Sequence, residues 1–363
     1  MNYNPDYLIV GAGLTGSVIA RLLFDRGNSV VVVDKRNHIA GNMYDYKHSS
    51  GILVHKYGPH YFRTTSDEIW GFVNRFSEFY KYEAFVKSYV DGNYENWPIA
   101  ASYIKKNIGL NWEPSYKADP KNFEEAALSL MPKEIYEKFI KFYNYKQWGV
   151  YCTELSASLI TRFNVREDDD PRLTPNAKYQ GLPSLGYTAM FENMLKDIDV
   201  KLNFDYLHNV DEIKPKKKTI FTGPIDEFFN NIYGKLKYRG QKRETKFIEN
   251  TDYYQPYCQV NEPSVERGDI IRTLEWKYLL DNNFDLKLKG TIITTETPYT
   301  PEKTDEYEYP FPDDDNNKLY LKYRELASLK KDVIICGRLG EYKYYDMDHA
   351  IERAFEIVKT IQN

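Results

Sequence analysis

Hydrophobic residues near the N-terminus change their period at a glycine-rich turn. Tyr7–Val10 form a short apolar run, and apolar residues then recur at helical spacing over 18–23. Gly11, Gly13 and Gly16 lie between the two segments. The pattern predicts a strand, a tight turn and a helix, with glycines where the turn, a pyrophosphate and the packing of helix on strand need space. The helix N-terminus would offer free N–H groups to phosphates.

A second apolar run, 29–33, ends in Asp34, at the place of the acid that binds ribose in dinucleotide folds. We therefore predict a dinucleotide site, with NAD and FAD both open at this point. The basic loop 35–42 could wrap an adenosine diphosphate. A buried-strand pattern at 332–338 and a helix opening at Tyr345 would close the fold from the far end of the chain. This closure suits FAD, although periodicity alone does not exclude NAD.

The rest of the chain divides into a helical and a β-rich segment. Apolar residues recur at three-to-four spacing over 120–148, with a break at Pro132, and a charged, proline-bearing loop follows over 165–183. The expected strands cover 201–207 and 219–221 in the nucleotide fold, and 253–260, 270–275 and 290–295 in a separate antiparallel sheet.

Composition narrows the class of protein. The 363 residues carry 49 basic and 53 acidic side chains, a net charge of −4, whereas nucleic-acid-binding proteins usually show a basic excess. The chain has no apolar run of about 18 residues and no basic signal-peptide segment, so we expect no membrane span and a cytoplasmic location. Its three cysteines show no CxxC and its six histidines no HExxH, so no metal site is expected.

Eight short motifs extend the interpretation to nearly the whole chain. They are VGAGLTG at 10–16, RNHIAGN at 36–42, YGPHYF at 57–62, KQWG at 146–149, YQG at 179–181, TGPIDEFF at 222–229, KYREL at 322–326 and GRLGEYKYYDMD at 337–348. In this order they make the chain resemble the UDP-galactopyranose mutase family. The resemblance implies an isomerase that interconverts pyranose and furanose forms of a UDP-sugar through a covalent adduct of the sugar with N5 of reduced FAD.

The resemblance also implies an architecture and partners. The fold class is α/β: a Rossmann-like FAD-binding domain with an inserted helical domain and an antiparallel β-sheet domain. The expected bounds are 1–66, 186–230 and 328–363 for the FAD domain, 67–84 and 99–165 for the helical domain with a mobile loop at 161–180, and 85–98 and 231–327 for the substrate-binding sheet. The expected partners are a UDP-sugar, an external reductant such as NAD(P)H and a second copy in a homodimer, with no nucleic acid.

Site residues carry over from the matching motifs. Arg162 and Arg272 correspond to the two diphosphate arginines, whose guanidinium groups bind phosphate bidentately and stay charged, and His60 and Arg63 complete the catalytic set. The substrate set is Phe139, Tyr143 and Trp148 as a uridine cradle with Asn144 beside them, Tyr309 and Tyr344 on the phosphates, Glu296 and Asp346 as orienting acids, and Arg172 in the mobile loop. The flavin set is Gly11, Gly13, Gly16, Asp34, Lys35, Gly41, Asn42, His60, Tyr61, Gly223, Arg338, Tyr345, Asp346 and Met347. N-capping of a helix is a competing role for Asp346.

Three departures from the family text lie near the ligand. Arg63 replaces the second histidine of the usual GPHxFHT, a loop tyrosine is missing with Arg172 the nearest substitute, and the usual Pro-Phe-Asn is lost around 97–100. They suggest UDP-N-acetylgalactosamine, or a deoxy or altro sugar, with Arg63 donating to the extra substituent. In the alternative, Arg63 is structural and galactose remains the substrate. Two other functions stay open: a flavin oxidoreductase of the amine-oxidase type, and an idle nucleotide-sugar binder.

Overall fold

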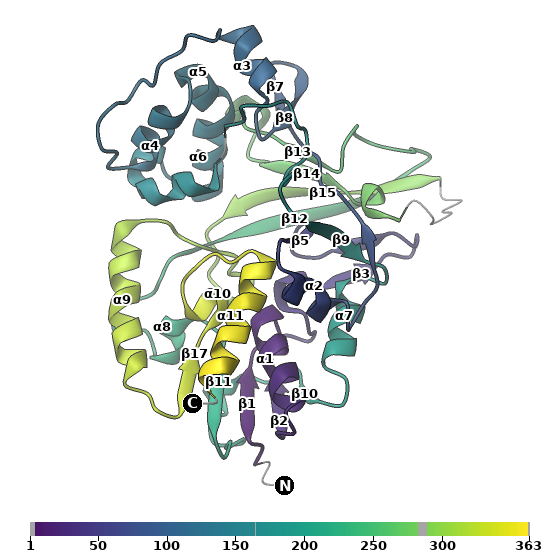
Figure 1. The fold of residues 1–363 in the computed structure, drawn as a ribbon, viewed down its shortest axis with the longest axis vertical. Coiled ribbons are helices and arrows are strands. Elements are labelled where there is room, and N and C mark those ends of the chain that lie inside the picture. Colours follow the sequence, from purple (N-terminus) through teal and green to yellow (C-terminus); the bar gives the residue numbers. More distant parts are fainter. Residues whose placement is uncertain (1–3, 164, 282–288, 362–363) are drawn as a thin grey trace.

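The computed structural model describes residues 4–163, 165–281 and 289–361, and three layers stand one above another in it (Figure 1). The lowest layer is a five-stranded parallel sheet in the order β10-β2-β1-β11-β17. Its strands are β1 (Tyr7–Val10), β2 (Val30–Val33), β10 (Asp199–Lys201), β11 (Lys218–Phe221) and β17 (Val333–Ile335). All four valines of β2 are buried, as in parallel sheets that are covered on both faces.

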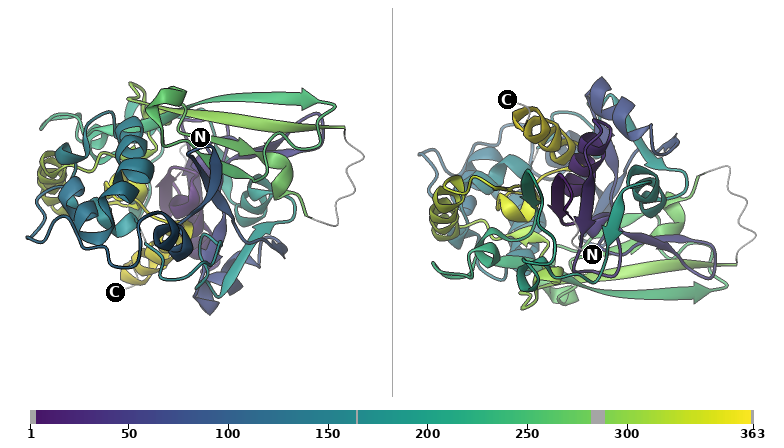
Figure 2. Two further views of the ribbon diagram at one scale, coloured as in Figure 1. Left: turned by 90° about the horizontal axis from the view of Figure 1, so that it is seen from above. Right: turned by 90° about the horizontal axis from the view of Figure 1, so that it is seen from below.

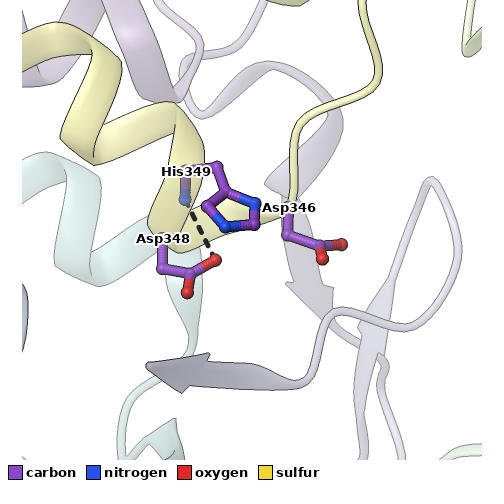
Figure 3. A group of neighbouring side chains, drawn as sticks. All are labelled: Asp346, Asp348 and His349. Atoms are coloured by element: carbon purple, nitrogen blue, oxygen red, sulfur yellow. Dashed lines mark hydrogen bonds between the residues drawn. The ribbon is translucent and has the colours of Figure 1, made fainter. Parts of the chain in front are cut away.

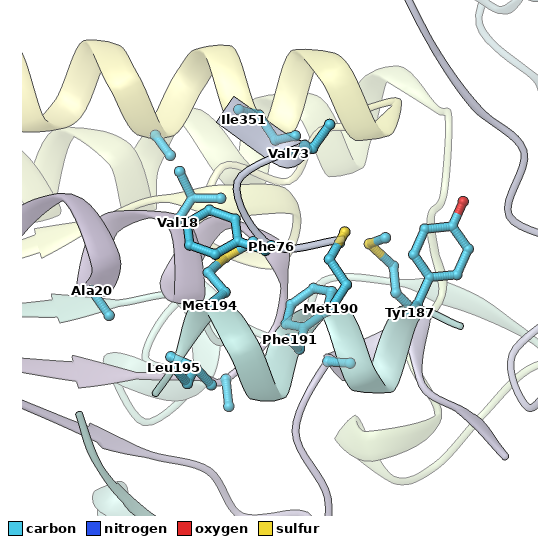
Figure 4. Close-up of a cluster of buried hydrophobic side chains, with 14 of the residues drawn as sticks. Val18, Ala20, Val73, Phe76, Tyr187, Met190, Phe191, Met194, Leu195 and Ile351 are labelled. Atoms are coloured by element: carbon cyan, nitrogen blue, oxygen red, sulfur yellow. The ribbon is translucent and has the colours of Figure 1, made fainter. Parts of the chain in front are cut away.

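Helices from both ends of the chain pack on this sheet. The helix α1 (Leu14–Phe24) lies against α11 (Met347–Thr360), as the strand and helix patterns at the two ends predicted. The main hydrophobic core lies beneath them, where α7 (Tyr187–Met194) turns Met190, Phe191 and Met194 toward Val18 and Ile351 (Figure 4).

The assignment of 67–84 to the helical domain is wrong. The helix α2 (Asp67–Val73) buries Ile69 and Phe72 in the same core as α1 and contacts α11. Downstream, β6 (Phe79–Lys81) joins β5 (Phe62–Thr64) and β9 (Tyr179–Pro183) in a small sheet. The tertiary contacts of the apolar face of α2 decide which core it joins, and the resemblance did not give these contacts.

The helical unit forms the top layer of Figure 1. Its helices are α3 (Ala101–Asn107), α4 (Phe123–Leu130), α5 (Lys133–Ile135) and α6 (Phe142–Trp148), with a π-helical segment over Tyr136–Lys141. The chain breaks at Pro132 as expected, since proline supplies no backbone N–H to continue the helix. Short 3-10 turns, Cys152–Glu154 and Ala157–Arg162, carry the chain out of the unit.

The middle layer is a seven-stranded sheet in the order β16-β12-β15-β14-β13-β7-β8, antiparallel except where β13 meets β7. Its strands are β7 (Val86–Val90), β8 (Asn93–Trp97), β12 (Tyr238–Glu249), β13 (Gln259–Asn261), β14 (Arg272–Glu275), β15 (Gly290–Tyr299) and β16 (Tyr309–Pro310). The paired β12 and β15 are the long green strands that run along one side of the molecule in Figure 2.

Two predicted strands are mostly not strands. Over 253–260 only the last two residues join β13, because the Glu275 carboxylate accepts from the N–H groups of Tyr254 and Gln255, both at 2.9 Å, in place of a strand partner. Over 201–207 the strand β10 ends at its first residue, since Asn203 adopts a positive φ of 55° and the Asp205 side chain caps a 3-10 turn.

The remaining strands and α-helices of the described residues are β3 (Asp45–Lys47), β4 (Leu53–His55), α8 (Ile225–Phe228), α9 (Asp314–Ser328) and α10 (Gly337–Gly340). None of the helices in the described ranges has the length and apolar character needed to cross a bilayer.

Candidate functional site

A cavity of about 1210 Å³ lies between the carboxyl ends of the parallel strands and the seven-stranded sheet. This is where open α/β sheets bind ligands. Every residue of the predicted flavin set lines it. From the catalytic and substrate sets, Arg63, Arg272, Tyr309, Tyr344 and Asp346 also line it.

At one end of the cavity the glycine-rich turn comes very close to a second loop. A Cβ on Gly16 would lie 2.0 Å from the carbonyl oxygen of Gly11, so α1 could not approach the turn with any other residue there. Gly41 has a φ of +54°, and a Cβ on it would lie 2.8 Å from the Cα of Gly13. The two loops therefore form a backbone cradle at the N-terminus of α1, where Gly13, as the N-cap, supplies no side-chain cap.

Asp34 closes this end of the cavity from the end of β2. Its two carboxylate oxygens accept from the backbone N–H groups of Ala12, at 2.7 Å, and Arg36, at 2.8 Å. The carboxylate is thus fixed beside the glycine turn. The Arg36 guanidinium donates to Asn42 at 2.9 Å and lies over the Tyr57 ring, so two further residues of the cavity wall hold the basic loop in place.

At the other end, arginines stack on tyrosines. The rings of Tyr309 and Tyr344 are nearly parallel, with centroids 6.1 Å apart. The Arg338 guanidinium lies over both, and Arg162 lies 3.9 Å above the Tyr344 ring. The buried Nε of Arg338 has no hydrogen-bond partner in the described part of the chain. Burial raises the pKa of Tyr309, so its hydroxyl stays protonated and can donate.

Arg272 reaches the cavity from β14 and is held from behind by Glu296 on β15. Glu296 is fully buried and also accepts from Arg243 Nε at 2.7 Å, and Arg243 in turn binds Glu308 through both Nη atoms at 2.7 and 2.8 Å. Burial opposes ionisation of Glu296, but the two guanidinium groups outweigh it and lower the pKa of the carboxyl. The carboxylate holds the Arg272 guanidinium, as an orienting acid would.

His60 and Arg63 lie between these two ends. Burial lowers the pKa of His60 to about 3, so the ring is neutral. Its Nδ1 lies 2.8 Å from the carbonyl oxygen of Gly58, which can only accept, so Nδ1 carries the proton and Nε2 is an acceptor. Arg63 donates to Asp346 at 2.9 Å. Asp346 is the N-cap residue of α11 but makes no side-chain cap hydrogen bond, so N-capping is not the role of its carboxylate.

Asp346 also belongs to a group of three side chains with metal-ligand atoms. Those of Asp346, Asp348 and His349 lie within 4.8 Å of one another at the start of α11 (Figure 3). The Arg63 guanidinium already neutralises Asp346, and Asp348 binds the backbone N–H of His349 at 2.9 Å. The arrangement is explained by these contacts without a cation.

Seven residues of the predicted substrate set do not line the cavity, namely Phe139, Tyr143, Asn144, Trp148, Arg162, Arg172 and Glu296. Phe139 and Trp148 pack in the core of the helical unit, and the buried Asn144 amide donates to the Ile140 carbonyl at 2.8 Å. Arg172 pairs with Asp170 at 2.5 Å and with Glu83 at 3.5 Å, so its charge is satisfied outside the cavity.

In this structure Arg172 therefore does not stand at the cavity in place of the missing loop tyrosine. Arg162 and Glu296 stand just behind the wall, next to Tyr344 and Arg272. Tyr143 lies close enough to Arg272 for that charge to act on its hydroxyl, although burial raises the pKa of Tyr143 to about 12.

The main residues that sequence reasoning missed are Arg243 and Glu308. Arg243 lies in the polar run QKRETK at 241–246, which has the composition of an exposed strand edge, and no local pattern marks it as buried. Only the pairing of β12 with β15, which places it opposite Glu296, could have indicated its position.

The fold and the cavity define a dinucleotide-binding α/β protein whose site joins a phosphate-binding turn to a cluster of arginines and tyrosines. Comparison with known proteins gives the family. The family model described as UDP-galactopyranose mutase matches residues 138–344, and the model of an NAD(P)-binding Rossmann-like domain matches 9–76. A probable UDP-galactopyranose mutase of Klebsiella pneumoniae is 34% identical and covers 99% of this chain and 96% of its own. The chain belongs to the UDP-galactopyranose mutase family, which consists of isomerases, and the resemblance and the fold class predicted from the motifs are confirmed.

The other matches include a second relative and two solved structures. A dTDP-fucopyranose mutase of Escherichia coli is 31% identical and covers 96% of each chain. The crystal structure of a reduced UDP-galactopyranose mutase superposes with a TM-score of 0.75 at 16% identity over 99% of this chain and 94% of that one. A putative protoporphyrinogen oxidase from Exiguobacterium follows with a TM-score of 0.64 at 10% identity, over 98% of both chains. These two likenesses describe the fold alone.

Proposed function

We propose that this protein interconverts the pyranose and furanose forms of a UDP-sugar with reduced FAD as its cofactor. The observation that carries the proposal is the continuity of the cavity: the glycine cradle and Asp34 lie at one end, and the arginine and tyrosine cluster lies at the other. A dinucleotide and a second diphosphate ligand can therefore meet in one continuous cavity.

Three features support FAD as the occupant of the first end. The cradle between Gly13 and Gly41 leaves room only for backbone, as close approach to a pyrophosphate requires. Asp34 stands at the ribose position, and the unpartnered Nε of Arg338 offers a buried donor farther along the cavity. When bound in its reduced form, the flavin supplies the nucleophile that the reaction needs, so the protein need not provide one.

The protein's own part is to bind and stabilise the departing diphosphate. Arg272 and Arg162 would each offer a guanidinium fork to the phosphate oxygens, and their charge matters most as the bond to the sugar breaks. The Tyr309 and Tyr344 hydroxyls would donate to the same oxygens. Tyr143 would carry the uracil from the helical side, with Phe139 and Trp148 supporting it from within the core.

The sugar would lie between the two ends, beside His60, Arg63 and Asp346. A neutral His60 can accept a hydrogen bond from a sugar hydroxyl through Nε2 without acting as a strong base. Arg63 would donate to a substituent absent from galactose, such as an N-acetyl carbonyl. The two named relatives act on different sugars and nucleotides, so the sugar must be determined by assay.

The test is to reduce the purified flavoprotein with dithionite and incubate it with UDP-galactose, UDP-N-acetylgalactosamine or dTDP-fucose. We expect a furanose product by chromatography for at least one of the two UDP-sugars, only after reduction and without net oxidation. An oxidoreductase would instead bleach its oxidised flavin on adding substrate, and an idle binder would retain UDP without product. Either outcome contradicts the proposal. An external reductant such as NAD(P)H and a homodimer belong to the same proposal and follow from the family.

A further inference from the structure

Glu296 sits in the middle of three adjacent strands with an arginine on each side. In the sheet register, Glu296 on β15 pairs with Arg272 on β14 and with Arg243 on β12. All three side chains point to the cavity side of the sheet, since the carboxylate contacts both guanidinium groups. The sheet register therefore places Arg243 and Arg272 on opposite sides of Glu296, each on a strand next to β15.

Arg243 has no direct place in the binding of ligand but holds two glutamates, each of which adjoins a residue proposed to bind it. Through Nε it fixes the Glu296 carboxylate that orients Arg272, and through both Nη atoms it fixes Glu308. Glu308 directly precedes Tyr309. The side chains of Arg243, Glu296 and Glu308 are 11%, 0% and 7% exposed, so water cannot replace these contacts.

The charges of this network matter because the ligand is an anion. The charges of the two arginines and two glutamates sum to zero. The network therefore does not weaken the attraction of Arg162 and Arg338 for the diphosphate. Without Arg243 the same space would hold one arginine and two buried carboxylates, a net charge of −1. At low effective dielectric, such a charge repels phosphate strongly and also draws Arg272 away from the ligand.

We propose that Arg243 is a positioning residue for the diphosphate site: it neutralises Glu296 and Glu308 together and thereby frees Arg272 and Tyr309 to bind phosphate. The inference deepens the proposed function and rests on it. It applies to the binding of the nucleotide diphosphate itself, independently of the reaction that follows.

The first test measures the affinity of the flavin-loaded protein for UDP by titration calorimetry. Arg243→Met, which keeps much of the side-chain volume, is expected to raise the dissociation constant roughly tenfold or more, because it leaves buried charge unpaired. Arg267→Met is the matched control. It also removes one positive charge, from the 3-10 turn Val265–Arg267 that precedes β14. This arginine is 51% exposed and paired with Glu262 at 2.9 Å, so we expect no change in affinity.

The second test separates charge balance from a merely structural role. Glu308→Gln in the Arg243→Met background brings the network back to neutrality, and we expect it to recover most of the lost affinity. Glu308→Gln alone leaves Arg243 in place and should bind UDP at least as well as the parent. Flavin content and the unfolding midpoint are measured for each variant, so that a folding failure of Arg243→Met is recognised. In that case the affinity of Glu308→Gln for UDP is the test of the inference.

Each outcome decides between the inference and the proposed function. If the parent protein does not bind UDP, the proposed UDP-sugar substrate is wrong, and the inference is wrong as well. If the parent binds but Arg243→Met binds equally well, only the inference fails. The inference also fails if the double variant is as weak as Arg243→Met, or if Glu308→Gln alone weakens binding to the same extent.

Discussion

At the scale of single residues, the structure changes the meaning of Arg63. The sequence marked it as a replacement for histidine, and the structure adds that it is paired with Asp346 while still lining the cavity. A guanidinium has five donors, and an ion pair through one nitrogen leaves others for a ligand. Arg63 can therefore serve as a fixed, charged donor beside the sugar, positioned by Asp346, the N-cap residue of α11.

Arg63→His should change the choice of sugar. A hydrogen bond from a charged donor is worth about 1.5 to 3 kcal/mol, so its loss should lower kcat/KM for UDP-N-acetylgalactosamine relative to UDP-galactose by at least about tenfold. The measurement is kcat/KM for both substrates with the reduced enzyme. Arg63→Lys, which keeps the charge near Asp346, serves as the control and should shift the ratio less. An unchanged ratio in Arg63→His would show that Arg63 is structural.

At the scale of elements, sequence patterns were most informative where neighbours in space are also neighbours in sequence. The strand, turn and helix at 7–24 were predicted because one glycine turn determines how they pack. The helix α2 was placed in the wrong unit, because the sequence of its apolar face does not indicate which core it joins. The same holds for the site. The arginines and tyrosines within motifs were predicted, whereas the position of Arg243 depends on the strand register of β12 and β15, which the sequence patterns do not give.

The close approach of the two glycine loops predicts the effect of Gly41→Ala. The new methyl group would lie 2.8 Å from the Gly13 Cα, so the loops must separate, and we expect at least about tenfold weaker flavin binding. The ratio of flavin to protein absorbance after dialysis measures this loss. Gly27→Ala is a matched control, since Gly27 also has a positive φ, of +81°, but open space around it. It should cost about 1 kcal/mol of stability and retain the flavin; equal flavin loss in both variants would refute the steric argument.

At the scale of the whole molecule, a buried histidine joins the nucleotide fold to the seven-stranded sheet. His55 on β4 packs against Tyr187 of α7 and against Trp276, the first residue of the 3-10 turn that follows β14. The indole of Trp276 donates to Thr294 on β15 at 2.7 Å. The Nδ1 of His55 accepts from the backbone N–H of His60 at 3.1 Å, so this ring is held neutral where the two layers meet.

The neutral histidines predict loss of stability in mild acid. Burial lowers the pKa of both His55 and His60 to about 3, while the unfolded chain protonates them near 6.5. Since the folded pKa is the lower one, the unfolded state binds more protons between these values, and stability falls as pH falls through 6.5. Each histidine should raise the unfolding equilibrium constant about tenfold between pH 7.5 and 5.5, as urea denaturation at the two pH values would measure. His55→Asn keeps an acceptor for the His60 N–H but does not titrate in this range, so it should remove about half of the pH effect on the free energy of unfolding. The same pH dependence in this variant as in the parent would show that acid acts elsewhere.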